Sequence, residues 1–483
     1  MDRQTCGVAF ACSTISATQC GLAHSLGILS VMIDAMPLCP SWLTTDLDAA
    51  AKLLPITASF HDGQWQLGGM SVTQIIAEFG SPVYVMDEQD FKARATAFRD
   101  AFAPWHVYYA SKAFLSRTVA RWARECGLGV DVCSAGELAT ALSAGVAAQS
   151  IGVHGNNKSQ SELATAIATG VGHIVVDTDD EIDRLAAIAG ASPIPVPVLV
   201  RVTPNVEAHT HAHVQTAIAD QKFGFALDGG VALGALLRLR EVPGIKLVGV
   251  HCHIGSQILD TSGFEQAIDR LIGLLASYRD STGEQLTDCG IGGGFGIAYT
   301  QADAVSPPSQ IASVLHDALE RARHQAGLGP LNVFIEPGRA IVGPACVALY
   351  TVGTVKPVHL SGGIRTYVAV DGGLADNPRP ALYQAEYSAL LANRDSSAPP
   401  MLCRVVGKYC ETGDILVLHT YLPSDIRPGD IVAVPSSGAY QRAMASNYNG
   451  SLRPPVVAVR DGRGTTMLRR ETIDDLLALD VGR

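Results

Sequence analysis

The sequence has few charged residues, no basic run and no long apolar run. Charged residues make up 17% of its 483 residues, whereas an average soluble chain contains about 25%. Because 46 Asp and Glu residues outnumber 35 Lys and Arg residues and no basic cluster occurs, the composition argues against a nucleic-acid-binding surface. The longest apolar stretch, residues 21–33, contains His24 and Ser25 and falls short of the roughly 18 residues of a membrane-spanning helix.

The cysteines are not spaced as in a disulfide framework or in a zinc site. The 11 cysteines are odd in number and scattered, so they do not form a disulfide framework, and none has the Cys-x-x-Cys spacing of a zinc site. Residues 1–40 contain Arg3 as the only early cation and no clear cleavage site, unlike a secretory signal peptide. We therefore expect a cytoplasmic protein.

The sequence does contain a regular alternation that begins near residue 105. Eight β-rich runs alternate with Ala- and Leu-rich stretches of helical period. The runs are residues 106–110, 129–132, 150–153, 173–177, 196–202, 246–251, 286–290 and 331–336. Helices are expected at 114–126, 136–144, 161–168, 180–189, 264–277 and 308–326. Eight βα units in succession predict a closed (β/α)8 barrel over residues 88–344.

A second domain follows the barrel. Residues 345–483 consist of short strand-like runs separated by turn residues, which predicts an all-β domain. A further strand-like run within residues 41–87 is expected to join this domain from the other end of the chain. The predicted fold class is therefore α/β, a (β/α)8 barrel plus a C-terminal β domain completed by an N-terminal segment.

Polar residues gather at the expected carboxyl ends of the barrel strands, where enzymes of this fold carry their chemistry. They are Lys112, Asp131, residues 154–158, Arg201, residues 253–256, residues 292–294 and residues 336–339. This ring predicts an active site at that end of the barrel.

Three features of the ring have both a chemical and a structural interpretation. Lys112 is either a rim residue or, if burial lowers its pKa, a Schiff-base lysine. Residues 292–294 form either a tight turn or a glycine loop whose backbone N–H groups bind phosphate. Glu336 forms either a surface ion pair or a carboxylate that holds a proton on a pyridine nitrogen, with His253 stacked on the same ring.

Histidines support a rival interpretation as metal ligands. His251 and His253 are two residues apart on a predicted strand, and His209, His211 and His213 repeat that spacing. Hydrolytic metal barrels use such pairs, but no matching set of carboxylates at the late strands is evident. A metal hydrolase therefore remains the alternative from another reaction class.

The β domain adds a group of polar side chains in predicted turns. Arg379 and Tyr383 are four residues apart, Cys410 and Glu411 are adjacent, and Tyr440 ends a Gly-Ala-Tyr turn. Taken singly, Arg379 fits a turn cation and Cys410 fits a buried, inert thiol. Their density in the turns of an otherwise apolar domain favours a binding role.

Taken in order, the motifs resemble those of the diaminopimelate decarboxylases, pyridoxal-phosphate enzymes of the alanine-racemase-like fold type III. The resemblance covers roughly residues 65–480. Its motifs are Tyr109-Ala-Ser-Lys-Ala113, His154-Gly-Asn-Asn-Lys158, Glu207-Ala-His-Thr-His211, Lys222-Phe-Gly224, His253-Ile-Gly-Ser-Gln257, Glu336-Pro-Gly-Arg339, Asp376-Asn-Pro-Arg-Pro380 and Cys410-Glu-Thr-Gly-Asp414. The resemblance implies decarboxylation of meso-2,6-diaminopimelate to L-lysine and carbon dioxide, the last step of lysine biosynthesis. Pyridoxal 5'-phosphate is the implied cofactor, with no metal.

The resemblance also implies roles for individual residues. Lys112 would form the Schiff base, and Cys410 from the partner subunit of a homodimer would donate the proton. The implied cofactor-binding residues are Lys112, Asp131, His253, Ser256, Gly292, Gly293, Gly294, Glu336, Gly338, Arg339 and Tyr440. The implied substrate-binding residues are Arg339, Arg379, Tyr383, Glu411 and Tyr440.

The charge pattern agrees with this substrate. The end of meso-diaminopimelate remote from the reaction carries a carboxylate, which Arg339 and Arg379 can bind, and an ammonium group, which Glu411 can pair. Decarboxylases of the same fold that act on arginine, ornithine or carboxynorspermidine are the nearest alternatives, but those lacking a distal carboxylate would not need Arg379 beside Glu411. An alanine-racemase-like isomerase would leave the Cys410-Glu411 pair unexplained.

Some neighbours of the site residues depart from the family pattern, namely Ala375, Tyr409, Thr412, Gln441 and Arg442. We expect these departures to change the rate of the reaction more than the type of reaction that is catalysed.

Residues 1–40 match nothing in the family. They are expected either to be disordered or to reflect the choice of start site, with Met32 and Met36 as alternatives.

Overall fold

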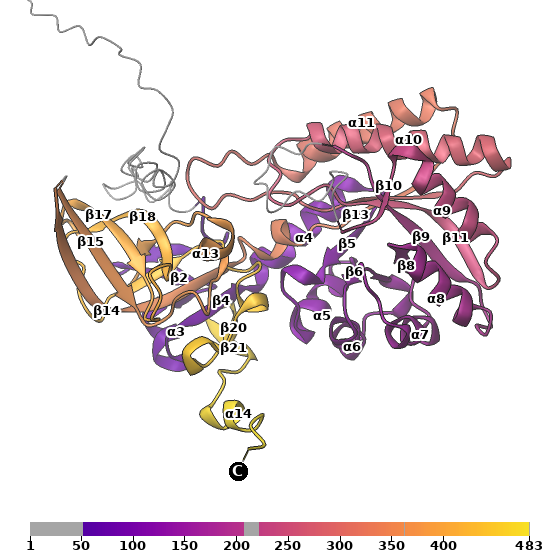
Figure 1. The fold of residues 1–483 in the computed structure, drawn as a ribbon. Helices are drawn as coiled ribbons and strands as arrows, with labels where there is room; N and C mark the ends of the chain where they lie inside the picture. Colours follow the sequence, from indigo (N-terminus) through magenta and orange to yellow (C-terminus); the bar gives the residue numbers. More distant parts are fainter. Residues whose placement is uncertain (1–51, 207–221, 362, 483) are drawn as a thin grey trace, which may run out of the picture. The chain divides into compact units, whose positions relative to one another are not determined.

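The computed structural model describes residues 52–206, 222–361 and 363–482, and its largest element is a closed barrel of eight parallel strands (Figure 1). The strands are β5 (His106–Ala110), β6 (Gly129–Val132), β7 (Ile151–Val153), β8 (His173–Val176), β9 (Val196–Thr203), β11 (Ile245–Cys252), β12 (Asp288–Gly292) and β13 (Asn332–Ile335). They pair in this order, and the pairing of β13 with β5 closes the barrel. The short β10 (Phe225–Ala226) pairs with β9. The predicted (β/α)8 barrel is therefore confirmed.

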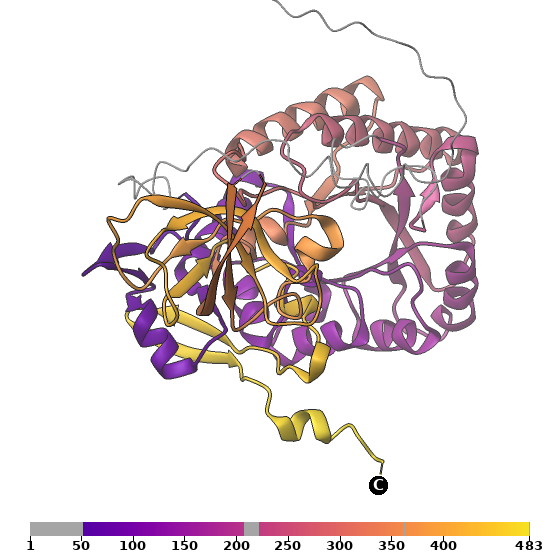
Figure 2. The ribbon, with the colours of Figure 1, turned by 60° about the vertical axis from the view of Figure 1, so that its left-hand side comes forward.

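Helices form an outer layer around these strands (Figure 2). They are α4 (Glu88–Phe102), α5 (Arg117–Glu125), α6 (Ala135–Ser143), α7 (Gln160–Thr169), α8 (Asp179–Ala189), α9 (Val231–Arg240), α10 (Ser262–Thr282) and α11 (Pro308–Gln325). The short helix α12 (Arg339–Val342) follows β13 and is buried. The hydroxyls of Ser116, Ser134, Ser159 and Thr178 accept a backbone N–H at the start of α5 to α8. These caps satisfy N–H groups that each helix leaves unpaired, so the chain passes from strand to helix within a few residues.

The interior of the barrel contains a small apolar cluster. Val175, Leu199 and Phe334 are its buried members, and Tyr108 packs against them. The ring of His173 lies 5.2 Å from that of Phe334 and 5.4 Å from that of Tyr108. Because side chains fill the interior in this way, the barrel is a packed core rather than a channel.

The second part of the fold is a β domain that includes strands from both ends of the chain. Its main sheet has the order β18-β17-β15-β14-β4-β20-β21, with β16 and β19 attached. The strands are β4 (Val83–Asp87), β14 (Cys346–Leu360), β15 (Gly363–Val370), β16 (Leu390–Leu391), β17 (Pro400–Val406), β18 (Ile415–Pro423), β19 (Ile431–Val434), β20 (Val456–Arg460) and β21 (Arg463–Leu468). β4 lies between β14 and β20, so a strand from the N-terminal side completes the domain, as predicted.

Smaller elements surround this sheet. They are β1 (Ser59–His61), β2 (Gln64–Leu67), β3 (Met70–Ser71), α3 (Val72–Phe79), α13 (Arg379–Tyr383) and α14 (Ile473–Leu477). Trp65, Val72 and Ile75 share a core with Val85 and Val457 of the sheet, which ties residues 59–79 to the β domain. Residues 41–51 of the predicted N-terminal segment lie outside the described residues. No helix within the described ranges is long and apolar enough to cross a membrane.

Loops of the β domain contact the carboxyl ends of the barrel strands. Tyr440 donates its backbone N–H to the carbonyl of Ala113 at 2.8 Å, just beyond β5. The hydroxyl of Ser436 donates to the carbonyl of Ala298 at 2.8 Å, and that of Ser388 to the carbonyl of Tyr299 at 3.0 Å. These bonds bring β-domain side chains to the end of the barrel where the polar ring was predicted.

Candidate active site

Lys112 lies directly after β5, and its nearest charged partner is on the neighbouring strand β6. The Lys112 Nζ lies 3.3 Å from the Oδ2 of Asp131, and the other oxygen of Asp131 accepts the backbone N–H of Ser111 at 3.2 Å. Burial is the largest single influence on the pKa of Lys112 and lowers it, but Asp131, Cys133, Tyr440 and Glu336 together outweigh burial, so the net pKa is raised. The condition considered for a Schiff-base lysine, a pKa lowered by burial, is therefore not met, because neighbouring groups outweigh burial.

Glu336, just beyond β13, is buried between two histidines. Its Oε1 lies 3.1 Å from the Nε2 of His154 and its Oε2 lies 3.1 Å from the Nε2 of His251. Burial alone would raise the pKa of Glu336, but the two imidazoles hold it well below its usual range. Burial lowers the pKa of His154 to about 4, so this imidazole is neutral near pH 7. Glu336 is thus an ionised carboxylate in a buried site, and not the surface ion pair of the alternative interpretation.

The two histidines predicted to form a metal site, His251 and His253, do not lie in one cluster of possible metal ligands within the described ranges. His154, His251 and Glu336 have ligand atoms within 4.8 Å of one another, which would suit a metal ion. His253 instead accepts the backbone N–H of Gly293 on its Nδ1 at 3.3 Å. His209, His211 and His213 lie outside the described residues. The contact between His251 Nε2 and Glu336 Oε2 is a hydrogen bond. Glu336 Oε1 and His154 Nε2 lie 3.1 Å apart, but among the described residues neither atom has a hydrogen-bond partner.

The glycine loop after β12 packs directly on the loops after β11 and β13. A Cβ on Gly293 would lie 2.0 Å from the carbonyl oxygen of Glu336, and one on Gly294 would lie 2.3 Å from that of Gly255. Gly292 and Gly294 also have positive φ angles of 76° and 110°. Only glycine permits this approach, which brings the three predicted phosphate-binding segments together. A Cβ on Gly338 would likewise lie 2.8 Å from the carbonyl oxygen of Ala110.

Arg339 links the barrel loops to the β domain. Its Nη2 donates to the hydroxyl of Ser256 at 2.7 Å, and its guanidinium carbon lies 4.7 Å from the centre of the Tyr440 ring. Tyr440 adopts a φ of 59°, which is unusual for a residue with a side chain. The structure therefore places the predicted residues Ser256, Arg339 and Tyr440 in one cluster.

Two tyrosines that the sequence analysis missed complete the arginine cluster. Arg379, at the start of α13, donates to the hydroxyls of Tyr299 at 2.7 Å and Tyr387 at 2.6 Å, and Arg339 also donates to that of Tyr299. Both arginines are only 6% exposed. Tyr383 ends α13 and is half-buried. The position of Tyr299 after the seventh barrel strand was the available signal for its role.

Cys410 and Glu411 are exposed in the single chain. The backbone N–H of Cys410 donates to the side-chain oxygen of Asn449 at 3.5 Å, and the hydroxyl of Tyr448 donates to Glu411. Among the described residues, neither has a hydrogen bond or ion pair with a barrel residue. The structure therefore does not bring this pair to Lys112 within one subunit.

The residues that depart from the family pattern lie in the β domain, and most of them form hydrogen bonds with other residues of that domain. Tyr409 donates its backbone N–H to Asp414 at 2.8 Å, and Gln441 donates its side-chain amide to the hydroxyl of Ser437 at 3.1 Å. Arg442 donates to the carbonyl of Pro454 at 3.2 Å, and Ala375 is buried. Thr412 lies in an exposed turn.

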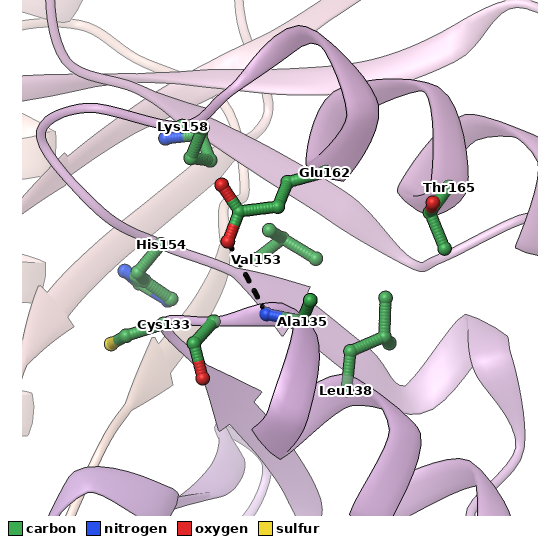
Figure 3. A pocket seen from close by; sticks show the side chains of 9 residues that line it. Cys133, Ala135, Leu138, Val153, His154, Lys158, Glu162 and Thr165 are labelled. Carbon is green, nitrogen blue, oxygen red and sulfur yellow. Dashed lines mark hydrogen bonds between the residues drawn. The ribbon is translucent and has the colours of Figure 1, made fainter. Parts of the chain in front are cut away.

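A pocket borders the site between the starts of α6 and α7 (Figure 3). Glu162 spans it and accepts the backbone N–H of Ala135 at 3.3 Å. Lys158 lines the pocket, but its Nζ contacts Glu181 at 2.8 Å and donates to two backbone carbonyls at 2.7 Å. Because these partners occupy the ammonium group, Lys158 has a structural role next to the site.

Comparison with known proteins identifies the family. Residues 88–343 match the model of the pyridoxal-binding domain of pyridoxal-dependent decarboxylases. The diaminopimelate decarboxylase of Mycobacterium tuberculosis is 49% identical over 424 residues, which cover 86% of this chain and 94% of that protein. The chain belongs to the diaminopimelate decarboxylase family. It is therefore a pyridoxal-phosphate-dependent carboxy-lyase, and the resemblance seen in its motifs is confirmed.

Two further similar proteins are also diaminopimelate decarboxylases. The diaminopimelate decarboxylase of Bacillus subtilis is 42% identical over 423 residues, 87% of this chain and 95% of that protein. The crystal structure of diaminopimelate decarboxylase from M. jannaschii in complex with L-lysine superposes with a TM-score of 0.82 at 28% identity, covering 88% of this chain and 98% of that one.

The residues of this decarboxylase fit pyridoxal phosphate. The loops at Gly293, Gly255 and Glu336 are in backbone contact that any Cβ would obstruct, and the helix α12 begins beside them, as at sites that bind phosphate. Glu336 provides a buried, ionised carboxylate that suits a protonated pyridine nitrogen. Lys112 is the half-exposed amine of the same ring of residues.

Proposed function

We propose that this enzyme converts meso-2,6-diaminopimelate to L-lysine and carbon dioxide, the last step of lysine biosynthesis, as a cytoplasmic homodimer. The observation that carries the proposal is the pair of buried guanidinium groups on Arg339 and Arg379. Both residues are 6% exposed, and within the described ranges their side chains donate to hydroxyl groups and form no ion pair with Asp or Glu. Buried charge without a partner is costly, so the pair is suited to an anionic substrate group.

The chemistry of the substrate explains this arrangement. meso-Diaminopimelate has two amino-acid centres, and the one that does not react retains a carboxylate and an ammonium group. Arg339 and Arg379 provide planar donors for that carboxylate. Glu411 is the proposed partner of the distal ammonium, and Tyr383 and Tyr440 are the proposed remaining contacts.

The remaining site residues are proposed to bind the cofactor and to hold protons on the lysine amine and on the pyridine nitrogen. Bound pyridoxal phosphate supplies an electron sink for the electron pair left by the departing carboxylate. Lys112 is the proposed covalent attachment point, and Asp131 is the group that holds the lysine proton. Glu336 is proposed to hold a proton on the pyridine nitrogen, and His253 to pack against the ring.

Phosphate binding is assigned to the three loops in backbone contact. Gly292, Gly293 and Gly294 would bind through their backbone, together with Ser256 and the segment 336–339, which includes Gly338. The residues of this set are contributed by the loops after β11, β12 and β13, the usual phosphate-binding side of the barrel.

Cys410 of the partner subunit is the proposed donor of the proton that replaces the lost carboxylate. The exposure of Cys410 and Glu411 in the single chain supports this assignment, because an interface would bury them against the second site. The proposed domains are the N-terminal segment 41–87, the barrel 88–344 and the β domain 345–483, with residues 1–40 as an extension.

The test is a product assay. The purified protein, loaded with pyridoxal phosphate, is incubated separately with meso-diaminopimelate, L-arginine, L-ornithine and L-lysine while carbon dioxide and amine products are measured. We expect L-lysine and carbon dioxide in equal amounts from meso-diaminopimelate. Faster release of carbon dioxide from arginine or ornithine would overturn the proposed substrate, and no release from any of the four would overturn the proposed function.

A further inference from the structure

The hydroxyl of Tyr299 is the point at which the two site arginines meet. The Nη1 of Arg339 and the Nη1 of Arg379 both donate to this oxygen, the latter at 2.7 Å. A phenol oxygen has two acceptor positions and one hydrogen to donate. The two arginines occupy both acceptor positions, and within the described residues no acceptor is hydrogen-bonded to the hydroxyl hydrogen.

The loop and ring of Tyr299 are held on several sides. Its backbone N–H donates to Asp303 at 2.9 Å, and its carbonyl accepts the hydroxyl of Ser388 at 3.0 Å. Its ring packs edge-on against that of Tyr387, with 4.9 Å between ring centres, and the residue is 6% exposed. A side chain fixed by barrel and β-domain contacts has little freedom to lose when a ligand binds.

Within the described part of the chain, no carboxylate is hydrogen-bonded to the hydroxyl of Tyr299, although Asp303 accepts its backbone N–H. The guanidinium carbons of Arg339 and Arg379 lie 5.8 Å and 5.0 Å from the centre of its ring, so two cations share one neutral phenol. The Nε of Arg339 is also buried, with no hydrogen-bond partner in the described part of the chain. Donor hydrogens of both arginines and of the phenol are therefore available for one anion.

We propose that Tyr299 is a specificity-determining residue that binds the carboxylate at the remote end of the substrate together with Arg339 and Arg379. The proposal rests on the proposed function, since that end is the part of the substrate that does not react. Tyr299 donates its hydroxyl hydrogen to the carboxylate and keeps the two guanidinium groups at the separation that a single carboxylate bridges. A diamine without this carboxylate leaves the donors unpaired, so the site disfavours it.

The test compares binding of two ligands to the holoenzyme. L-Lysine carries the distal carboxylate, and cadaverine is the same chain with hydrogen in its place. Dissociation constants are measured calorimetrically for the wild type, Tyr299→Phe and the control Tyr278→Phe, a buried tyrosine of the outer helix α10. Tyr299→Phe keeps the ring against Tyr387 and removes only the hydroxyl.

We expect Tyr299→Phe to weaken L-lysine binding by about ten- to a hundredfold, the loss for a hydrogen bond to a charged group, with cadaverine binding unchanged. The KM for meso-diaminopimelate should rise correspondingly, kcat should change less, and Tyr278→Phe should change neither. Ser388→Ala removes the hydrogen bond to the backbone carbonyl of Tyr299. This change should weaken the binding of L-lysine but not of cadaverine, and by less than Tyr299→Phe does.

Two results would overturn the proposal. Equal weakening of both ligands would show that Tyr299 only supports the fold, and unchanged L-lysine binding would show that the hydroxyl does not contact the carboxylate. The binding measurement does not depend on turnover. A wild type that prefers L-lysine through Tyr299 but forms no product from meso-diaminopimelate would therefore contradict the proposed function and support the role of Tyr299.

Discussion

The amino group of Lys112 lies 3.3 Å from the carboxylate of Asp131, and the two residues stand at the ends of the adjacent parallel strands β5 and β6. The register pairs Ala110 with Asp131, so the side chain of Asp131 reaches the turn that carries Lys112. Asp131 raises the pKa of Lys112 against the effect of burial. The amine must lose this proton before it can react with a carbonyl group.

Substitution of Asp131 by Asn should make Lys112 more reactive at lower pH. The change removes the opposite charge but can keep the bond to the backbone N–H of Ser111. Loss of an adjacent opposite charge shifts a pKa by about 1 to 3 units. The measurement is the rate at which the cofactor-free protein binds pyridoxal phosphate covalently, recorded as a function of pH. The midpoint of this pH profile should lie at least about one pH unit lower in Asp131→Asn than in the wild type. An unchanged midpoint would show that Asp131 does not control the amine.

Gly293→Ala should destabilise the protein and weaken its retention of pyridoxal phosphate. The new methyl group would lie 2.0 Å from the carbonyl oxygen of Glu336, which requires the loops to separate. Overpacking of this kind costs about 1 to 3 kcal/mol. Urea unfolding and absorbance after dialysis measure the two effects.

Gly234→Ala is the matched control for this change. Gly234 lies inside helix α9, and a Cβ there meets nothing within 4 Å. Replacing it should stabilise the helix by about 0.5 to 1 kcal/mol and leave cofactor retention unchanged. Equal retention in Gly293→Ala and Gly234→Ala would contradict the role assigned to the glycine loop.

His173 should make the protein less stable in mild acid. Its ring is buried between Tyr108 and Phe334, its Nε2 has no hydrogen-bond partner among the described residues, and burial lowers its pKa to about 4. Between that value and the unfolded value near 6.5, the unfolded chain binds a proton that the folded chain does not. Stability is therefore complete above about pH 6.5 and falls as the pH drops toward 4.

His173→Phe should remove this contribution and keep the shape of the ring. The loss of unfolding free energy between pH 7 and pH 5 should shrink by about 2 kcal/mol relative to the wild type. Urea unfolding at the two pH values measures it, with the exposed His324→Gln as control. The same loss in His173→Phe and the wild type would contradict the assignment.

The sequence predicted the barrel and the place of its site because both depend on local patterns. Buried strands and capped helices repeat along the chain, and the residues that end the strands necessarily meet at one end of a parallel barrel. The contacts of Glu336 with His154 and His251 depend on the closure of the barrel, and no local spacing indicates them. Tyr299 lies in a loop without periodicity, so its hydroxyl could be placed only by the structure.

The proposed sharing of sites between subunits predicts complementation. Lys112→Ala and Cys410→Ala should each be inactive as pure homodimers. When the two are unfolded together and refolded, a hybrid dimer contains one site with both native residues, so about a quarter of wild-type activity should return. No recovery despite hybrid formation, measured with two affinity tags, would place Cys410 and Lys112 in the same subunit.

The most direct measurement identifies the lysine that carries the cofactor. Burial lowers the pKa of Lys158, so pKa alone would favour it over Lys112. Lys158, however, is 3% exposed with its ammonium occupied, whereas the Lys112 side chain is 36% exposed. The holoenzyme is reduced with borohydride and digested, and the peptide bearing the pyridoxyl group is identified by mass spectrometry. The group is expected on Lys112 and absent in Lys112→Ala; a label on Lys158, or none on either lysine, would contradict the account.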